Sequence, residues 1–159
     1  MQSRIRDNMH RQAGALKVLF GLLEEEFACL TGRDPQAVTG IELSVQELLR
    51  QVAMERVALR KLVVATVPGA QNMADFVATL PQEDRGEFER LLREADEREQ
   101  ACAVQAEKNA QLAYALVEQS RGMLDFMHRQ IQPKDTTTYG RSGRYAQHHP
   151  QAALLRGRL

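Results

Sequence analysis

The sequence has no tryptophan, only 5% aromatic residues, two cysteines and no long apolar run. With so few aromatics, an ordered core must be built mainly from aliphatic side chains. Cys29 and Cys102 are too far apart in sequence to suggest a metal-ligand set or a disulfide framework. No run approaches the roughly 18–20 apolar residues that span a bilayer, and residues 1–30 lack the apolar core of a signal peptide. We therefore expect a cytoplasmic protein without membrane insertion.

Net charge is also absent, because 21 basic residues balance 21 acidic residues. The whole-chain charge therefore favours neither nucleic acid nor a membrane surface as a partner. The balance hides an asymmetry. Five basic residues and one acidic residue follow Pro133, a net charge of +4, so the preceding part carries about −4. Glycines and polar residues also dominate this C-terminal part, which predicts a flexible basic tail over residues 133–159.

Proline is absent between Pro81 and Pro133, which allows one helix over residues 81–131, about 75 Å long at 1.5 Å per residue. Pro81 suits a first helical turn, and Pro133 ends the helix because it disfavours the helical conformation of the residue before it. A heptad seam runs along this segment through Phe88, Ala95, Cys102, Asn109, Leu116 and Met123. A helix of this length needs partners elsewhere in the chain.

The first partner is a helix over residues 5–31. Its apolar residues form two heptad columns, Met9, Leu16, Leu23 and Leu30 in one, and Ala13, Phe20 and Phe27 in the other. We expect Gly32 to adopt the left-handed conformation that ends the helix. Gly14 and Gly21 lie inside it and cost about 1 kcal/mol each relative to alanine. We expect them to allow the close approach of a neighbouring backbone.

The second partner is a helix over residues 34–66, with Asp34 as its N-cap and Pro35 in its first turn. Its seam contains Val38, Val45, Val52 and Leu59. Glu55 interrupts the apolar pattern and is interpreted as a solvated flank. A short helix over residues 72–79, capped by Asn72, should pack on the long helix. These segments predict an all-α domain over residues 1–132, an antiparallel bundle of three long helices with coiled-coil-like seams plus the short helix.

No constellation for catalysis or for a metal or cofactor is apparent. His148 and His149 have no carboxylate or cysteine at ligand spacing. His10 lies on a predicted helix, where it could belong to a phosphotransfer bundle, but its flanking residues do not support that interpretation. The glutamate runs lack a nucleophile or a partner base. We therefore expect a binding protein and no enzyme activity.

Asn109 is the most informative polar residue, because apolar residues stand one heptad away on each side, at Cys102 and Leu116. A buried seam asparagine fixes register at a cost in stability. Alternatively, Asn109 contacts another protein on an unpaired part of the helix. The sequence favours neither interpretation.

Three stretches carry a resemblance to a known family. They are the Leu-Leu-Glu-Glu-Glu turn at residues 22–26, the Glu-Lys-Asn-Ala-Gln-Leu segment at residues 107–112, and Thr-Tyr-Gly-Arg-Ser-Gly-Arg at residues 138–144. Together they resemble the FlgN family of flagellar type III export chaperones, over essentially the whole chain. The tail motif is the more specific part. The sequence lacks a tryptophan that some members carry before the third helix.

The resemblance implies a chaperone that binds the hook–filament junction proteins FlgK and FlgL and delivers them to the cytoplasmic domain of the export gate FlhA. The client-binding residues are then expected to be Asn109, Leu112, Leu116, Met123, Phe126 and Ile131. Tyr139, with Gly140 and Gly143, would dock on the gate. The alternative function is a coiled-coil adaptor or oligomerisation protein without a chaperone role. The choice of client, the stoichiometry and self-association of the free protein are left open.

Overall fold

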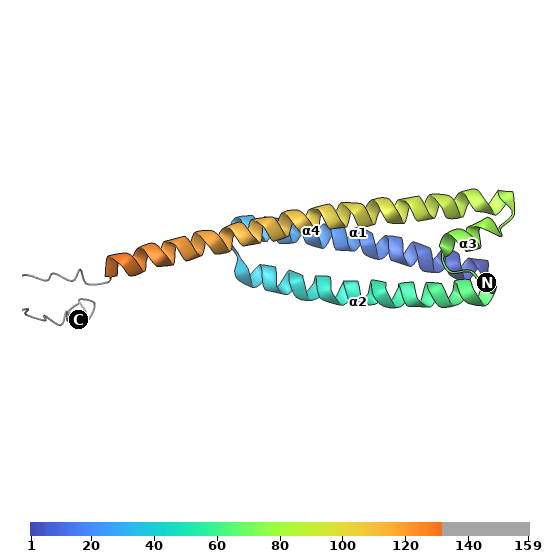
Figure 1. The fold of residues 1–159 in the computed structure, drawn as a ribbon, viewed down its shortest axis with the longest axis horizontal. Coiled ribbons are helices and arrows are strands. Elements are labelled where there is room, and N and C mark those ends of the chain that lie inside the picture. The colour runs from blue at the N-terminus through green and yellow to red at the C-terminus, as the bar shows by residue number, and fades with distance from the viewer. Residues whose placement is uncertain (132–159) are drawn as a thin grey trace, which may run out of the picture. The chain divides into compact units, whose positions relative to one another are not determined.

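The computed structural model describes residues 1–131, and this part of the chain is built from helices (Figure 1). They are α1 (Gln2–Gly32), α2 (Pro35–Thr66), α3 (Met73–Ala78) and α4 (Gln82–Ile131). No strand occurs among the described residues, so the prediction of an all-helical protein is confirmed for them. One compact unit comprises Met1–Ala115, and a second begins at Leu116, within α4. The predicted domain boundary after residue 132 lies one residue beyond the end of α4 and stays a prediction.

Side chains and backbone groups at the helix ends explain most of these bounds. Asp34 caps α2, since its carboxylate accepts a hydrogen bond from the Ala37 N–H at 3.0 Å. Asn72 and Asp75 form a capping box at the start of α3. The end of α1 differs from the prediction, because the left-handed residue is Arg33, with φ of 56°, and Gly32 is still helical. Arg33 and Asp34 N–H groups then reach the last carbonyls of α1.

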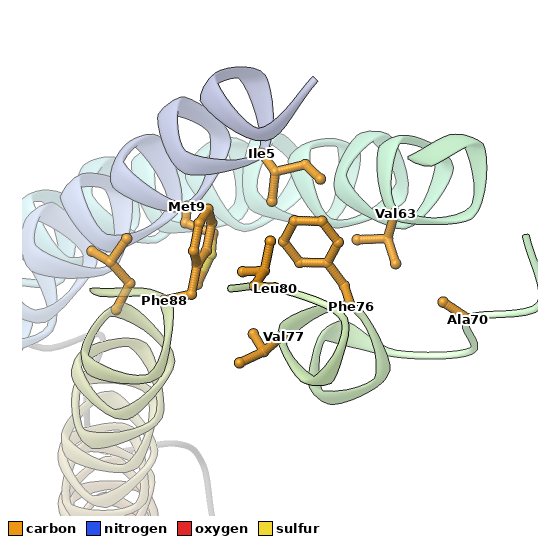
Figure 2. Packing of buried hydrophobic residues seen from close by; sticks show 9 residues of the cluster. Ile5, Met9, Val63, Ala70, Phe76, Val77, Leu80 and Phe88 are labelled. Atoms are coloured by element: carbon orange, nitrogen blue, oxygen red, sulfur yellow. The ribbon is translucent and has the colours of Figure 1, made fainter. Parts of the chain in front are cut away.

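One core cluster lies where α3 meets the ends of the three long helices (Figure 2). Phe76 of α3 meets Phe88 of α4 edge to face, with ring centroids 5.4 Å apart and planes at 83°. Arg6 places its guanidinium 5.6 Å from the Phe88 ring centroid and pairs with Glu87 at 3.0 Å. The short helix therefore packs on α4 as expected. The buried members of the cluster are Ile5, Met9, Val63, Ala70, Phe76, Val77, Leu80, Phe88 and Leu91.

A second core cluster, further along α1, consists of Leu16, Leu19, Leu23 and Cys102, with Phe20, Val45 and Leu48 partly buried against it. The two clusters define the directions of the helices within Met1–Ala115. The beginning of α1 packs on the end of α2, and its later part packs on the middle of α2, so these helices are antiparallel. Arg98 of α4 contacts Ala13 of α1, and Asn109, later in α4, contacts Leu23, later in α1. These two helices are therefore parallel.

The glycines of α1 do not have the role expected from the sequence. A Cβ atom added at Gly14 or Gly21 would meet no atom within 4 Å among the described residues. Both positions are exposed, so no backbone within residues 1–131 approaches them closely. Phe27, the last residue of the second predicted column, is also exposed, whereas Ala13 is buried and Phe20 is half-buried. The core stripe of α1 therefore narrows toward its C-terminal end.

Candidate functional site

Helices α1 and α4 are joined by donors on α4 that reach backbone carbonyls of α1. Arg98 donates to the Ala13 carbonyl at 3.0 Å, and Asn109 donates to the Leu23 carbonyl at 2.8 Å. Between them, the Cys102 thiol lies 3.5 Å from the carbonyl oxygen of Leu16. The sequence separations are 85, 86 and 86 residues. This nearly constant offset sets the register of two parallel helices.

Asn109 has the most complete set of partners in this contact, and it is only 3% exposed. Besides the Leu23 carbonyl, its amide nitrogen donates to the Glu26 carboxylate at 2.7 Å. Its amide oxygen accepts a hydrogen bond from Gln105 at 3.0 Å. A buried amide with all of these partners fits the register interpretation that the sequence left open. In the free protein, Asn109 faces α1.

Beyond Asn109 the same helical face becomes exposed. Leu112 and Leu116 are half-buried, whereas Met123 is 57% exposed and Ile131 is exposed to a similar degree. The face also includes Met127, which the sequence pattern places on it, and two residues that the sequence interpretation missed, Val117 and Leu124; all three are exposed. The column at positions 117, 124 and 131 repeats every seven residues and could have revealed Val117 and Leu124. We call the following six residues the C-terminal stripe of α4: Leu116, Val117, Met123, Leu124, Met127 and Ile131.

Phe126 lies at the edge of this stripe. At about 100° per residue, its side chain projects about 100° around the helix from Met127. It is more exposed than any residue of the stripe, at 62%. Of the client-binding residues expected from the sequence, Leu116, Met123 and Ile131 therefore share one face. Leu112 and Phe126 flank it, and Asn109 lies in the contact with α1.

Polar residues occupy the rest of the helix around the C-terminal stripe. Glu118 and Arg121 form an ion pair at 3.1 Å, and the Ser120 hydroxyl donates to the Leu116 carbonyl at 2.9 Å. Asp125 and Arg129 add one charge of each sign. The segment from residue 116 to residue 131 is therefore an amphipathic helix with little net charge, which suits contact with another amphipathic helix.

A polar network joins α1 to α2, and the sequence interpretation missed it. Glu55 accepts two hydrogen bonds from Arg11, at 2.9 and 3.0 Å, and one from the Asn8 amide. Asn8 is fully buried and accepts a bond from Gln12 at 2.6 Å. The hydrogen bonds from Arg11 are the main cause that lowers the pKa of Glu55. Glu55 therefore connects two helices, and the interpretation of this residue as a solvated flank was wrong.

The described residues show little sign of other chemistry. His10 and His128 are both exposed on helices. Within residues 1–131, no group of three or more His, Cys, Asp or Glu side chains is placed to hold a metal ion. None of the helices in this part of the chain is long and apolar enough to cross a membrane. Tyr139, Gly140 and Gly143, expected to dock on the gate, lie outside the described residues.

Comparisons with known proteins agree with the resemblance seen in the sequence. Neither curated proteins nor solved structures give a significant match. The family model of the FlgN protein matches residues 1–147, which include α1–α4 and the Tyr-Gly motif of the tail. The chain therefore belongs to the FlgN family of flagellar export chaperones.

Proposed function

We propose that this chaperone binds the C-terminal helical segments of the hook–filament junction proteins FlgK and FlgL through the C-terminal stripe of α4. The observation that carries the proposal is the change in exposure along one helical face. Cys102 and Asn109 are buried, and Met123, two heptads beyond Asn109, is exposed. A heptad seam that continues without a partner in the described part of the chain suits a client helix, which would contribute its own residues at i, i+3, i+4 and i+7.

The side chains of the stripe fit this role. Leucine, isoleucine and valine supply apolar area, and burial of each contributes about 1.5–3 kcal/mol. Met123 and Met127 have flexible, polarisable side chains that can adapt to more than one client sequence. The polar remainder of the segment, with Glu118 paired to Arg121, keeps the free helix hydrated. When the client helix lies on the stripe, the apolar face of the client is shielded from other subunits, and the client stays unassembled.

Two further parts of the chain complete the proposal. Within residues 1–115, α2 runs antiparallel to α1 and to the first part of α4, and α4 contacts both helices in this three-helix bundle. The tail then docks on the cytoplasmic domain of the export gate FlhA through Tyr139, aided by Gly140 and Gly143. The family match supports the second part, since it extends to residue 147 and so includes this motif. A tyrosine ring provides apolar area and a hydroxyl for a hydrogen bond, as at many interface hot spots.

Binding to C-terminal fragments of FlgK and FlgL, measured by isothermal titration calorimetry, tests the proposal. The double variant Met123→Glu, Leu124→Glu should weaken binding at least 100-fold, because two charges would be buried in an apolar contact. Tyr114→Glu is the matched control, since Tyr114 is even more exposed on α4 than Met123 and Leu124 but lies away from the stripe. It should leave the affinity unchanged.

Two results would contradict this assignment. Equal loss of binding in the control variant would show that the C-terminal stripe is not the specific contact. Melting of the free double variant well below wild type would show that these side chains belong to the folded core. If neither client fragment binds the wild-type protein, the adaptor or oligomerisation function becomes the better explanation.

A further inference from the structure

Helix α2 carries a second apolar stripe on the side opposite its core face. Its buried residues are Ile41, Val52 and Val63. On the other side, Leu43 and Met54 are 63% and 64% exposed, and Val57 and Val64 are also exposed. Four large apolar side chains on the outward face of one helix exceed the scattered exposure that is normal for a surface.

These residues are part of a regular pattern. Positions 43, 47, 50, 54, 57, 61 and 64 follow one another at alternating steps of four and three, which is the spacing of the a and d positions of a heptad seam. Charged residues occupy the three positions between the apolar ones. The outer seam of α2, as we call it, consists of Leu43, Glu47, Arg50, Met54, Val57, Lys61 and Val64.

We propose that the outer seam of α2 binds the outer seam of a second copy of this chain, with the two helices antiparallel. In an antiparallel pair each a position packs against a d position of the partner, so few registers are available. One of them places the two-fold axis between Leu48 and Leu49. Its layers pair apolar with apolar and charge with opposite charge: Leu43 with Met54, Glu47 with Arg50, and Gly40 with Val57 of the second copy.

The neighbouring registers lack this complementarity. Moving the partner by one heptad places Leu43 opposite Lys61, so a charge would face the apolar layer. Moving it by two heptads places Arg50 opposite Lys61, and like charges at such close quarters are unfavourable. Charge complementarity therefore selects both the occupant and the register, because the same residues on two copies satisfy each other.

Two features of the free protein fit this interface. The Glu47 carboxylate already accepts hydrogen bonds from Arg50 at 3.0 and 2.9 Å, so a two-fold axis would bring together four alternating charges. Gly40 lies inside α2, where glycine costs about 1 kcal/mol relative to alanine. Among the described residues no atom lies within 4 Å of the place where its Cβ would be. Opposite Val57 of a second copy, the missing side chain leaves the room that this valine needs.

The interface is small. From Gly40 to Val57 the helices overlap for about 26 Å, which places the buried area at the low end of specific interfaces. We therefore expect a reversible dimer that forms with rising protein concentration. The proposal does not depend on client binding, since the outer seam lies on α2 and the C-terminal stripe lies on α4.

Sedimentation velocity of the full chain over a concentration series tests the proposal. Met54→Glu should raise the dimer dissociation constant at least tenfold. Glu47→Arg and Arg50→Glu should each do the same, because each would place like charges opposite one another. Their combination should restore the constant to within about threefold of wild type. Val18→Glu, at an exposed apolar position on α1, is the control and should have no effect.

Disulfide cross-linking tests the register separately. In a Cys29→Ser background, Leu43→Cys with Met54→Cys should give a covalent dimer on oxidation, whereas Leu43→Cys with Lys61→Cys should not. A protein that stays monomeric up to about 1 mM overturns the proposal, because the dissociation constant of any dimer would then be too high for a specific interface. It is equally overturned by a dimer that Met123→Glu dissociates and Met54→Glu does not, because the contact would then lie on α4.

Discussion

Replacing Asn109 with alanine should destabilise the protein by about 2–3 kcal/mol and leave client affinity unchanged. The change separates the two roles that the sequence allowed for this residue. If Asn109 fixes the register between α1 and α4, its loss reduces folding stability. If it contacts a client, its loss reduces binding. The structure, in which Asn109 faces α1, predicts the first result.

The magnitude follows from the partners of the side chain. Its bond to the Glu26 carboxylate, at 2.7 Å, is of the charged kind that contributes about 1.5–3 kcal/mol. Its bond to the Leu23 carbonyl, at 2.8 Å, adds about 0.5–1.5 kcal/mol. That carbonyl also belongs to a helix, and Glu26 is half-buried and can reach water. Neither acceptor is left without a hydrogen-bond partner, so the loss of folding stability stays in the lower part of the summed range.

Urea denaturation followed by far-UV circular dichroism measures the change, and calorimetric titration with a client fragment measures the affinity. Ser120→Ala is the control, because that hydroxyl bonds to the Leu116 carbonyl of its own helix; it should change stability by less than about 0.5 kcal/mol. The reasoning is refuted if Asn109→Ala is as stable as the control, or if the folded variant loses affinity for the client.

Three other predictions follow from the structure and the sequence. Gly14→Ala and Gly21→Ala should each stabilise the protein by about 1 kcal/mol, additively, in the same denaturation assay, and any destabilisation would reveal a neighbour that the structure does not show. Since Arg11 lowers the pKa of Glu55 below its ordinary 4.5, the stabilisation is present above pH 4.5 and is lost as the pH falls through the lower folded value. Glu55→Gln should therefore flatten the acid limb of a stability–pH curve, and an unchanged curve would refute that role. Tyr139→Ala should leave folding and client binding intact but weaken binding of the chaperone–client complex to FlhA, as measured by direct titration; unchanged gate affinity would show that the tyrosine has another purpose.

The sequence predicted the helices well because their signals are local. Pro35 and Pro81 mark the starts of α2 and α4 to within one residue, and Asp34 caps α2 as expected. The heptad seams also identified core residues such as Leu16 and Val52, both buried. These features depend only on the spacing of residues along one helix, and that spacing can be read directly from the sequence.

Features that depend on two helices could not be predicted in the same way. Glu55 looked solvated because it is a charged residue that interrupts an apolar pattern, and only the fold brings Asn8 and Arg11 opposite it. The role of Asn109 likewise needed the register of α4 against α1. Arg33 was missed for a different reason, because the adjacent Gly32 is the better residue for a left-handed conformation, whereas α1 continues through Gly32.

The nearly constant offset between the donors of α4 and the carbonyls of α1 also constrains how this protein can evolve. Inserting or deleting one residue between Arg98 and Asn109 would turn one donor by about 100° away from α1 while the other stayed in place. A compensating change of the same length between Ala13 and Leu23 would be needed in the partner helix. Related sequences should therefore change the lengths of these two segments only together and keep the buried residues of the second core cluster apolar. Insertions and deletions should accumulate in other parts of the chain, where no pair of contacts with a second helix fixes the length of the segment.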